Sequence, residues 1–105
     1  MKKLLVCAAA AVATLAGCAT NTPAPVAEMS AARAMVSQAQ PAASQYAPNE
    51  LRAAQAKLER AEAAMAQEKH TEALILAEQA EVDAKLAWTI ADSERAKQAL
   101  AEVRK

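Results

Sequence analysis

The chain has 105 residues, and its 12 Lys and Arg balance its 12 Asp and Glu, so the formal net charge is zero. This balance excludes the strongly basic surface that nucleic-acid-binding domains carry. Hydrophobic residues make up 54% of the chain but aromatic residues only 2%, and Phe is absent. Most other positions hold Ala, Leu, Glu, Gln, Lys or Arg, which are strong helix formers. We therefore predict an all-α protein.

Residues 1–17 have the features of a signal peptide. Met1-Lys2-Lys3 precedes an apolar run that is too short to cross a membrane as a helix. The run closes with Leu15-Ala16-Gly17-Cys18. This pattern resembles the lipobox of bacterial lipoproteins. The resemblance implies that Leu15, Ala16 and Gly17 form the signal-peptidase recognition sequence, that cleavage occurs before Cys18, and that Cys18 carries a lipid with palmitate-type chains.

The predicted lipid on Cys18 would anchor the mature chain. Each buried methylene contributes about 0.8 kcal/mol, so two or three acyl chains hold a protein far longer than one does. Cleavage removes Cys7, which leaves no thiol for a disulfide. Ala19 follows Cys18, where an Asp would retain a lipoprotein in the inner membrane of enteric-type bacteria. We therefore expect the periplasmic face of the outer membrane. The competing interpretation is an ordinary signal peptide with a chance cysteine.

Residues 18–27 are predicted to form a tether, and residues 28–105 a helical domain. Pro23 and Pro25 favour an extended path for the tether. A first, short helix is expected over about 28–40, because apolar residues recur there at steps of three and four. Pro41 to Pro48 is then expected to form a kink or connecting turn.

From Asn49 onward the chain has neither Gly nor Pro. Asn49 is a suitable N-cap for a helix over about 49–67. The six polar residues at 67–72 predict a turn, and a last helix follows over about 72–104. These elements predict a long Ala-rich antiparallel helical hairpin. Its interaction face would comprise Ala73, Ala77, Ala80, Ala84, Ala87 and Trp88.

A single helix of about 50 residues in a parallel coiled coil is the alternative. Its heptad seam would hold Ile75, Val82, Leu86, Ala96, Leu100 and Val103. The same seam contains polar residues that count against this alternative: Glu68, Glu72, Gln79, Thr89 and Ser93.

Two segments of the sequence carry a family resemblance. The first is Tyr46-Ala47-Pro48-Asn49-Glu50-Leu51, and the second is the Ala-rich run over 71–87 with its Gln79-Ala80 and Asp83-Ala84 pairs. The arrangement resembles a bacterial lipoprotein family whose shared domain has no known function. Many relatives continue into an OmpA-like peptidoglycan-binding domain. This sequence stops at Lys105, so that activity is not carried over.

Catalytic chemistry has few candidates. His70 is the only histidine, and it falls in the predicted polar turn, where we expect a solvated side chain. Glu59 with Glu62, and Glu78 with Glu81, lie one helical turn apart and suit solvated helix faces better than acid–base catalysis. The sequence has no metal-ligand spacing, phosphate loop or nucleophile motif. We expect no enzyme activity, no metal and no cofactor other than the lipid.

Tyr46 and Trp88 are candidate binding anchors, unless Tyr46 packs on the hairpin and Trp88 fills a gap among alanines. The final Arg104-Lys105 resembles the end of murein lipoproteins, whose last lysine is linked covalently to peptidoglycan. We expect a structural or adaptor protein of the cell envelope that binds another envelope protein or a second copy of itself, and no nucleic acid. The alternative is a tether, covalent or non-covalent, between outer membrane and peptidoglycan through Lys105.

Overall fold

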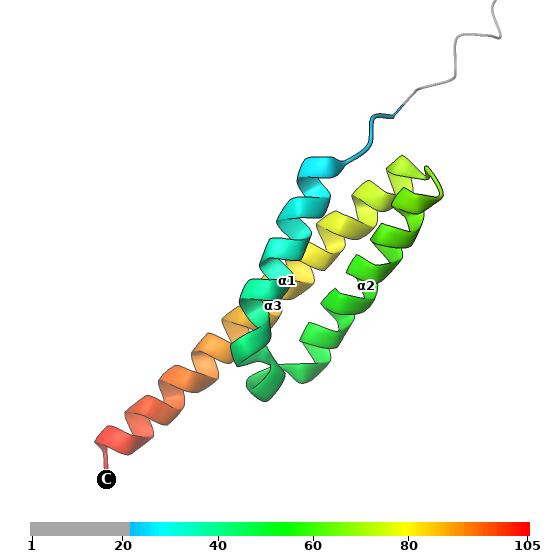
Figure 1. Cartoon of the computed structure of the whole chain (residues 1–105). Coiled ribbons are helices and arrows are strands. Elements are labelled where there is room, and N and C mark those ends of the chain that lie inside the picture. Colours follow the sequence, from blue (N-terminus) through cyan, green and yellow to red (C-terminus); the bar gives the residue numbers. More distant parts are fainter. Residues whose placement is uncertain (1–21) are drawn as a thin grey trace, which may run out of the picture.

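A computed structural model describes residues 22–105 and confirms the predicted all-α class. Within this range it contains three helices and no strand: α1 (Val26–Tyr46), α2 (Pro48–Ala66) and α3 (His70–Val103). Helices α1 and α3 run in the same direction, and α2 runs back beside them (Figure 1). Helices α2 and α3 form the predicted antiparallel hairpin. The alternative of one continuous helix is therefore wrong.

Helix α1 is longer than the sequence predicted. It has 21 residues and continues through Pro41 to Tyr46, where we expected a kink or turn. Pro41 is exposed, whereas Ala39 and Ala43 on either side of it are completely buried. A proline inside a helix costs about 3 kcal/mol. The apolar stripe of α1 nevertheless continues past the proline, and its burial keeps this part of the chain helical.

Helix α2 begins one residue earlier than predicted. Pro48 occupies its first turn, a position where proline is favoured because its missing N–H needs no partner. Asn49 is therefore not the N-cap. Its side-chain oxygen instead accepts a hydrogen bond from Arg52 Nη2 at 2.6 Å. Only Ala47, which is buried, separates α1 from α2.

The turn between α2 and α3 is shorter than the polar block at 67–72. It comprises only residues 67–69, since α3 begins at His70. The Lys69 N–H donates to Ala64 O at 2.9 Å and the Glu68 N–H to Met65 O at 3.0 Å, the pattern of a Schellman motif. This motif places Glu68 in the left-handed region, at φ 57°.

The core is built mainly from alanine. Met29 is the largest side chain that is fully buried. One cluster of buried residues lies near the turn and includes Met29, Ala61 and Leu76, and a second extends from Val36 to Ala91. Methyl side chains allow helix axes to approach closely, but each buries little apolar area. Such a core tolerates no large increase in side-chain volume.

Helix α3 extends beyond the other two helices (Figure 1). Ala91 is its last buried residue, and nearly all residues after it are exposed. We call residues 92–103 the overhang. Tyr46, at the end of α1, is half-buried against the core and donates a hydrogen bond from its hydroxyl to Gln98 Oε1 at 2.8 Å. This contact joins the middle of the overhang to the bundle.

Candidate interaction surface

The tether joins the bundle at the end that carries the α2–α3 turn. His70 Nδ1 lies 2.8 Å from the carbonyl oxygen of Thr22, and Thr71 Oγ1 donates to Thr22 Oγ1 at 3.3 Å. Because a carbonyl oxygen only accepts, Nδ1 carries the proton in this contact. His70 is thus a half-buried first residue of α3 rather than a solvated turn residue. The predicted lipobox, Leu15, Ala16, Gly17 and Cys18, lies outside the described residues.

The alanines of the predicted interaction face lie inside the protein. Each has an exposed fraction of 0%, and together they face α1 and α2 of the same chain: Ala73, Ala77, Ala80, Ala84 and Ala87. They offer no surface to a partner, so this part of the prediction is wrong. The physical reason is that the Ala stripe is needed to close the three-helix core.

Trp88 is the one residue of the predicted face that reaches the surface. Its exposed fraction is 40%, so it does not fill a gap in the core. A half-exposed indole next to the alanine core combines apolar area with an N–H group that can donate a hydrogen bond. Trp88 therefore remains a candidate contact residue.

Lys105 lies beyond the end of α3 and is exposed. Its Nζ is 3.2 Å from Glu102 Oε1, and about three-quarters of each side chain is accessible (75% and 73%). An ion pair this exposed contributes little and exchanges readily with water. The ε-amine is therefore available for reaction or binding at the end opposite to the tether.

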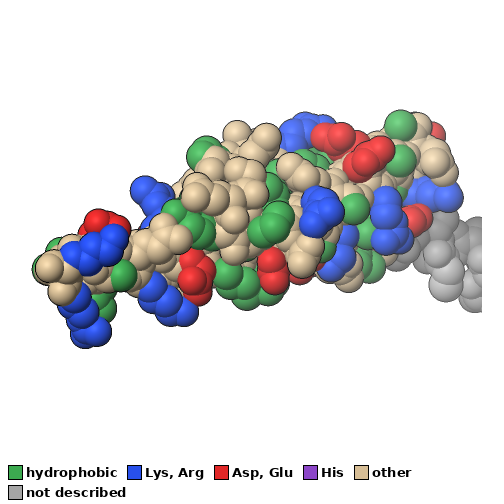
Figure 2. Space-filling model, turned by 90° about the horizontal axis from the view of Figure 1, so that it is seen from below, with side chains coloured by type: hydrophobic (Ala, Val, Ile, Leu, Met, Phe, Trp, Pro, Cys, Tyr) green, Lys and Arg blue, Asp and Glu red, His purple; other side chains and the backbone are tan. Residues whose placement is uncertain are grey.

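Apart from Trp88, the large exposed apolar side chains of α3 lie on the side opposite to its buried alanines, and their exposed fractions run from 49% for Ile75 to 83% for Val103. We call this set, together with the exposed Ala96, the outer stripe; its apolar members are Ile75, Val82, Leu86, Ala96, Leu100 and Val103. Figure 2 shows hydrophobic side chains among charged ones along one face of the molecule, from the overhang on the left into the bundle. The outer stripe corresponds to the heptad seam that the sequence indicated, but it lies on the surface.

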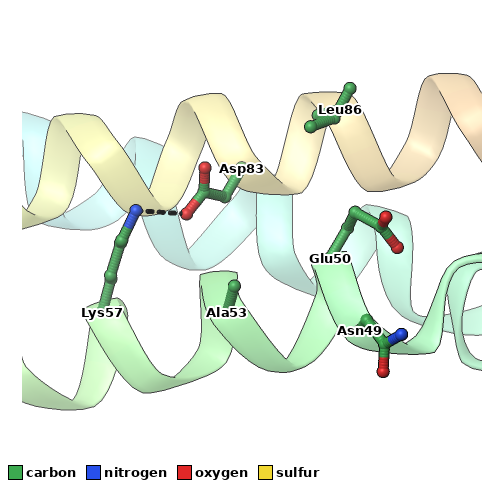
Figure 3. Close-up of a pocket in the computed structure, with 6 residues that line it drawn as sticks. All are labelled: Asn49, Glu50, Ala53, Lys57, Asp83 and Leu86. Atoms are coloured by element: carbon green, nitrogen blue, oxygen red, sulfur yellow. Dashed lines mark ion pairs between the residues drawn. The ribbon is translucent and has the colours of Figure 1, made fainter.

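A groove of about 350 Å³ runs between α2 and α3 beside the outer stripe. Lys57 from α2 and Asp83 from α3 point toward one another across it, with Nζ and Oδ2 2.6 Å apart (Figure 3). The side chain of Leu86 points away from α2 at the outer margin of the groove (Figure 3). Asp83 Oδ2 is buried and accepts no well-aligned hydrogen bond, so the charge of Lys57 is what compensates it. This pair links two helices.

The remaining carboxylates of interest are distributed over the helix surfaces. Glu62 accepts a hydrogen bond from Arg33 Nε at 2.8 Å, which joins α2 to α1. Glu81 pairs with Lys85 at 2.7 Å within α3. Among residues 22–105, no three His, Cys, Asp or Glu side chains are grouped so that they could hold a metal ion. None of the described helices is both long enough and apolar enough to cross a membrane.

Sequence comparison places the chain in a family. The model of the domain of unknown function DUF4398 matches residues 27–103, a range that covers all three helices except Val26, the first residue of α1. No curated protein and no solved structure matches the chain. Because the family model spans more than half of the sequence, the chain belongs to the DUF4398 family.

Proposed function

We propose that this protein is a lipid-anchored outer-membrane lipoprotein that acts without catalysis, as a helical interaction module of the periplasmic cell envelope. The observation that carries the proposal is the Leu15-Ala16-Gly17-Cys18 pattern at the end of a short apolar run. The anchor would be attached through the tether. The partner would be another envelope protein or a further copy of this chain.

The arrangement of the helices supports this role. The described tether contacts the bundle at the turn end through Thr22 and His70, and the overhang projects from the other end (Figure 1). At 1.5 Å per residue α3 is about 51 Å long. A chain anchored at Cys18 would therefore present the overhang away from the membrane. Trp88 and the outer stripe would be its accessible contact residues.

Metabolic labelling with a palmitate analogue in the native host tests the anchor. The wild-type protein should be labelled, Cys18→Ala should not, and Cys7→Ala should be labelled like the wild type because Cys7 would be removed with the signal peptide. Separation of inner and outer membranes then tests the location, and the labelled protein should be found with the outer membrane. Absence of label in the wild type, or equal labelling of Cys18→Ala, would contradict the proposal.

A second function, the tether to peptidoglycan, is favoured by the exposure of Lys105 beyond the C-terminal end of α3, whereas Thr22 contacts the first residue of that helix. The ε-amine of Lys105 would attack a peptide carbonyl of the cell wall in a transpeptidation, so that a new amide bond forms at Nζ while the old peptide bond breaks and its amine leaves as an ammonium group. Sacculi boiled in detergent and digested with muramidase would then release the protein. Lys105→Arg retains the charge but removes the primary amine, so it should abolish the sacculus-bound fraction, whereas Lys97→Arg should not. Protein found wholly in the detergent wash would exclude covalent linkage.

A further inference from the structure

The outer stripe of α3 has the spacing of a coiled-coil seam. The positions follow one another at alternating steps of four and three residues, polar members included: Ile75, Gln79, Val82, Leu86, Thr89, Ser93, Ala96, Leu100 and Val103. Heptad spacing sustained over about four heptads indicates a coiled coil. None of these residues is needed to close the bundle, since the buried stripe of α3 lies on its other side. Helix α3 therefore has two apolar faces, the buried alanine face and the exposed outer stripe.

The overhang buries no apolar side chain within the single chain, and the hydrogen bond from Tyr46 to Gln98 is its contact with the bundle. Residues 92–103 are in helical conformation, yet beyond Ala91 the helix buries no further apolar residue. Helices shorter than about 12–15 residues are only marginally stable in water. Leu100 and Val103 would gain the burial that stabilises this segment if a second helix packed along the outer stripe. The position of the stripe in the overhang thus favours a long, continuous helix as the occupant.

We propose that this occupant is α3 of a second copy of the chain, packed parallel and in register. In that arrangement each stripe residue meets its own counterpart, so apolar residues meet apolar ones. The polar members also match, because Gln79, Thr89 and Ser93 each face a side chain that can both donate and accept a hydrogen bond. Polar side chains at such positions fix register at some cost in stability.

Within the overhang, the charges beside the stripe are complementary in the parallel register. Asp92 directly precedes the stripe residue Ser93, and Lys97 directly follows the stripe residue Ala96. In a parallel pair, Asp92 of each copy therefore approaches Lys97 of the other copy. In the single chain Lys97 Nζ lies 2.8 Å from Glu94 Oε1, an exposed pair that the contact with Asp92 of the other copy would replace. Farther toward the turn, Glu78 would approach Asp83 of the other copy, a like-charged contact that counts against the pairing and that Lys57, already paired with Asp83, offsets only in part.

The antiparallel register that aligns the same stripe is less favourable. Pairing Leu86 with Ala96, and Val82 with Leu100, would bring the two Asp92 carboxylates against each other. It would also place Gln79 against Val103. Parallel packing avoids both mismatches. The flanking charges do not separate the two registers further, because the antiparallel one would pair Asp83 with Lys97 whereas the parallel one brings Glu78 against Asp83. Parallel packing also places the two tethers at the same end of the pair, as two copies anchored in one leaflet require, although the proposal does not depend on the anchor.

Single cysteines introduced into the outer stripe test the register. The full chain carrying Cys7→Ser and Cys18→Ser serves as the background, so that every disulfide arises from the added residue. Ser93→Cys and Ala96→Cys should each give disulfide-linked dimers under mild oxidation. Ala101→Cys, which is exposed on the same helix but outside the stripe, should give at least ten-fold less. Equal or absent crosslinking at all three positions would overturn the proposal, and so would a disulfide that forms only between Leu86→Cys and Ala96→Cys chains.

A charge exchange tests the parallel pairing without cysteine. In the same background, Asp92→Lys should raise the dimer dissociation constant measured by sedimentation at least ten-fold. The reason is that the new lysine of each copy would lie beside Lys97 of the other copy. Adding Lys97→Asp should restore the dimer. A chain that stays monomeric before any substitution, or a double variant that remains as weak as Asp92→Lys, would overturn the proposal. Neither outcome depends on lipidation of Cys18, which the palmitate experiment measures separately.

Discussion

Lys57 Nζ and Asp83 Oδ2 form a 2.6 Å ion pair that joins α2 to α3 (Figure 3). The cation and the carboxylate of this pair are each less exposed than the corresponding side chains of the other ion pairs in the described residues, and Asp83 Oδ2 is buried. The lysine side chain is one-third exposed (33%), so solvent screens part of the interaction. Removing the cation would nevertheless leave a buried, charged oxygen without compensation.

Lys57→Met should therefore lower the free energy of unfolding by about 1–3 kcal/mol, as expected when a buried polar group loses its partner. Urea unfolding followed by circular dichroism measures the change. Lys85→Met, which breaks the exposed pair with Glu81, should cost no more than about 0.5 kcal/mol. If Asp83→Leu fails to recover stability when added to Lys57→Met, the explanation through an uncompensated carboxylate is wrong.

Ala80 shows how little room the core contains, because its side chain is completely buried between helices. Ala80→Leu adds three carbon atoms where methyl groups set the spacing of the helices, and we expect a loss of about 1–3 kcal/mol or more. Ala56→Leu introduces the same change on the exposed side of α2 and should be almost neutral. Thermal unfolding of both variants provides the comparison. Equal melting temperatures would show that the core adapts to the larger side chain.

Glu68 is strained by its left-handed conformation, φ 57°. A residue with a Cβ loses about 1–2 kcal/mol there, and glycine does not. Glu68→Gly should thus stabilise the protein, by about 0.5–1 kcal/mol once the greater entropy of the unfolded chain is counted. Lys69→Gly increases the entropy of the unfolded chain by a similar amount. Lys69 has φ −85°, so glycine relieves no strain there and the substitution should destabilise the protein. Opposite shifts in urea midpoint are expected, and shifts of the same sign would contradict the argument.

The sequence was sufficient to predict the fold class and the hairpin, because the helix-forming residues and the polar block at 67–72 act locally. The heptad spacing of Ile75, Val82 and Leu86 was also recognised. The sequence did not show that these residues would lie on the surface. Helix α3 has two apolar stripes, and periodicity alone does not indicate which of them packs in the core. In the structure the alanine stripe packs in the core. Its small side chains allow α1 and α2 to approach α3 closely.

The link between Lys57 and Asp83 was missed for a different reason. Asp83 lies between the buried positions Ala80 and Ala84 on the side of α3 that faces α2. A helical projection of α3 could have placed this carboxylate at the edge of the core. The partner, Lys57, could not be identified in that way, because the relative alignment of α2 and α3 depends on a turn of only three residues, 67–69, within a longer polar block.

Pro41 provides a test of how tertiary packing overrides local preference. The proline lies inside α1, where it supplies no N–H to the helix. Pro41→Ala restores this donor and removes the ring. We expect the substitution to raise the free energy of unfolding by about 1–2 kcal/mol. This gain is smaller than the cost of about 3 kcal/mol for proline in a helix interior, because the unfolded chain also gains entropy when proline is replaced. Pro48→Ala makes the same exchange in the first turn of α2, where proline is favoured, and should be neutral or destabilising. Equilibrium unfolding of the two variants decides the matter. If Pro41→Ala destabilises the protein as much as Pro48→Ala does, Pro41 contributes a contact or a bend that α1 needs. The burial of residues on either side of Pro41 would then not be what keeps α1 helical.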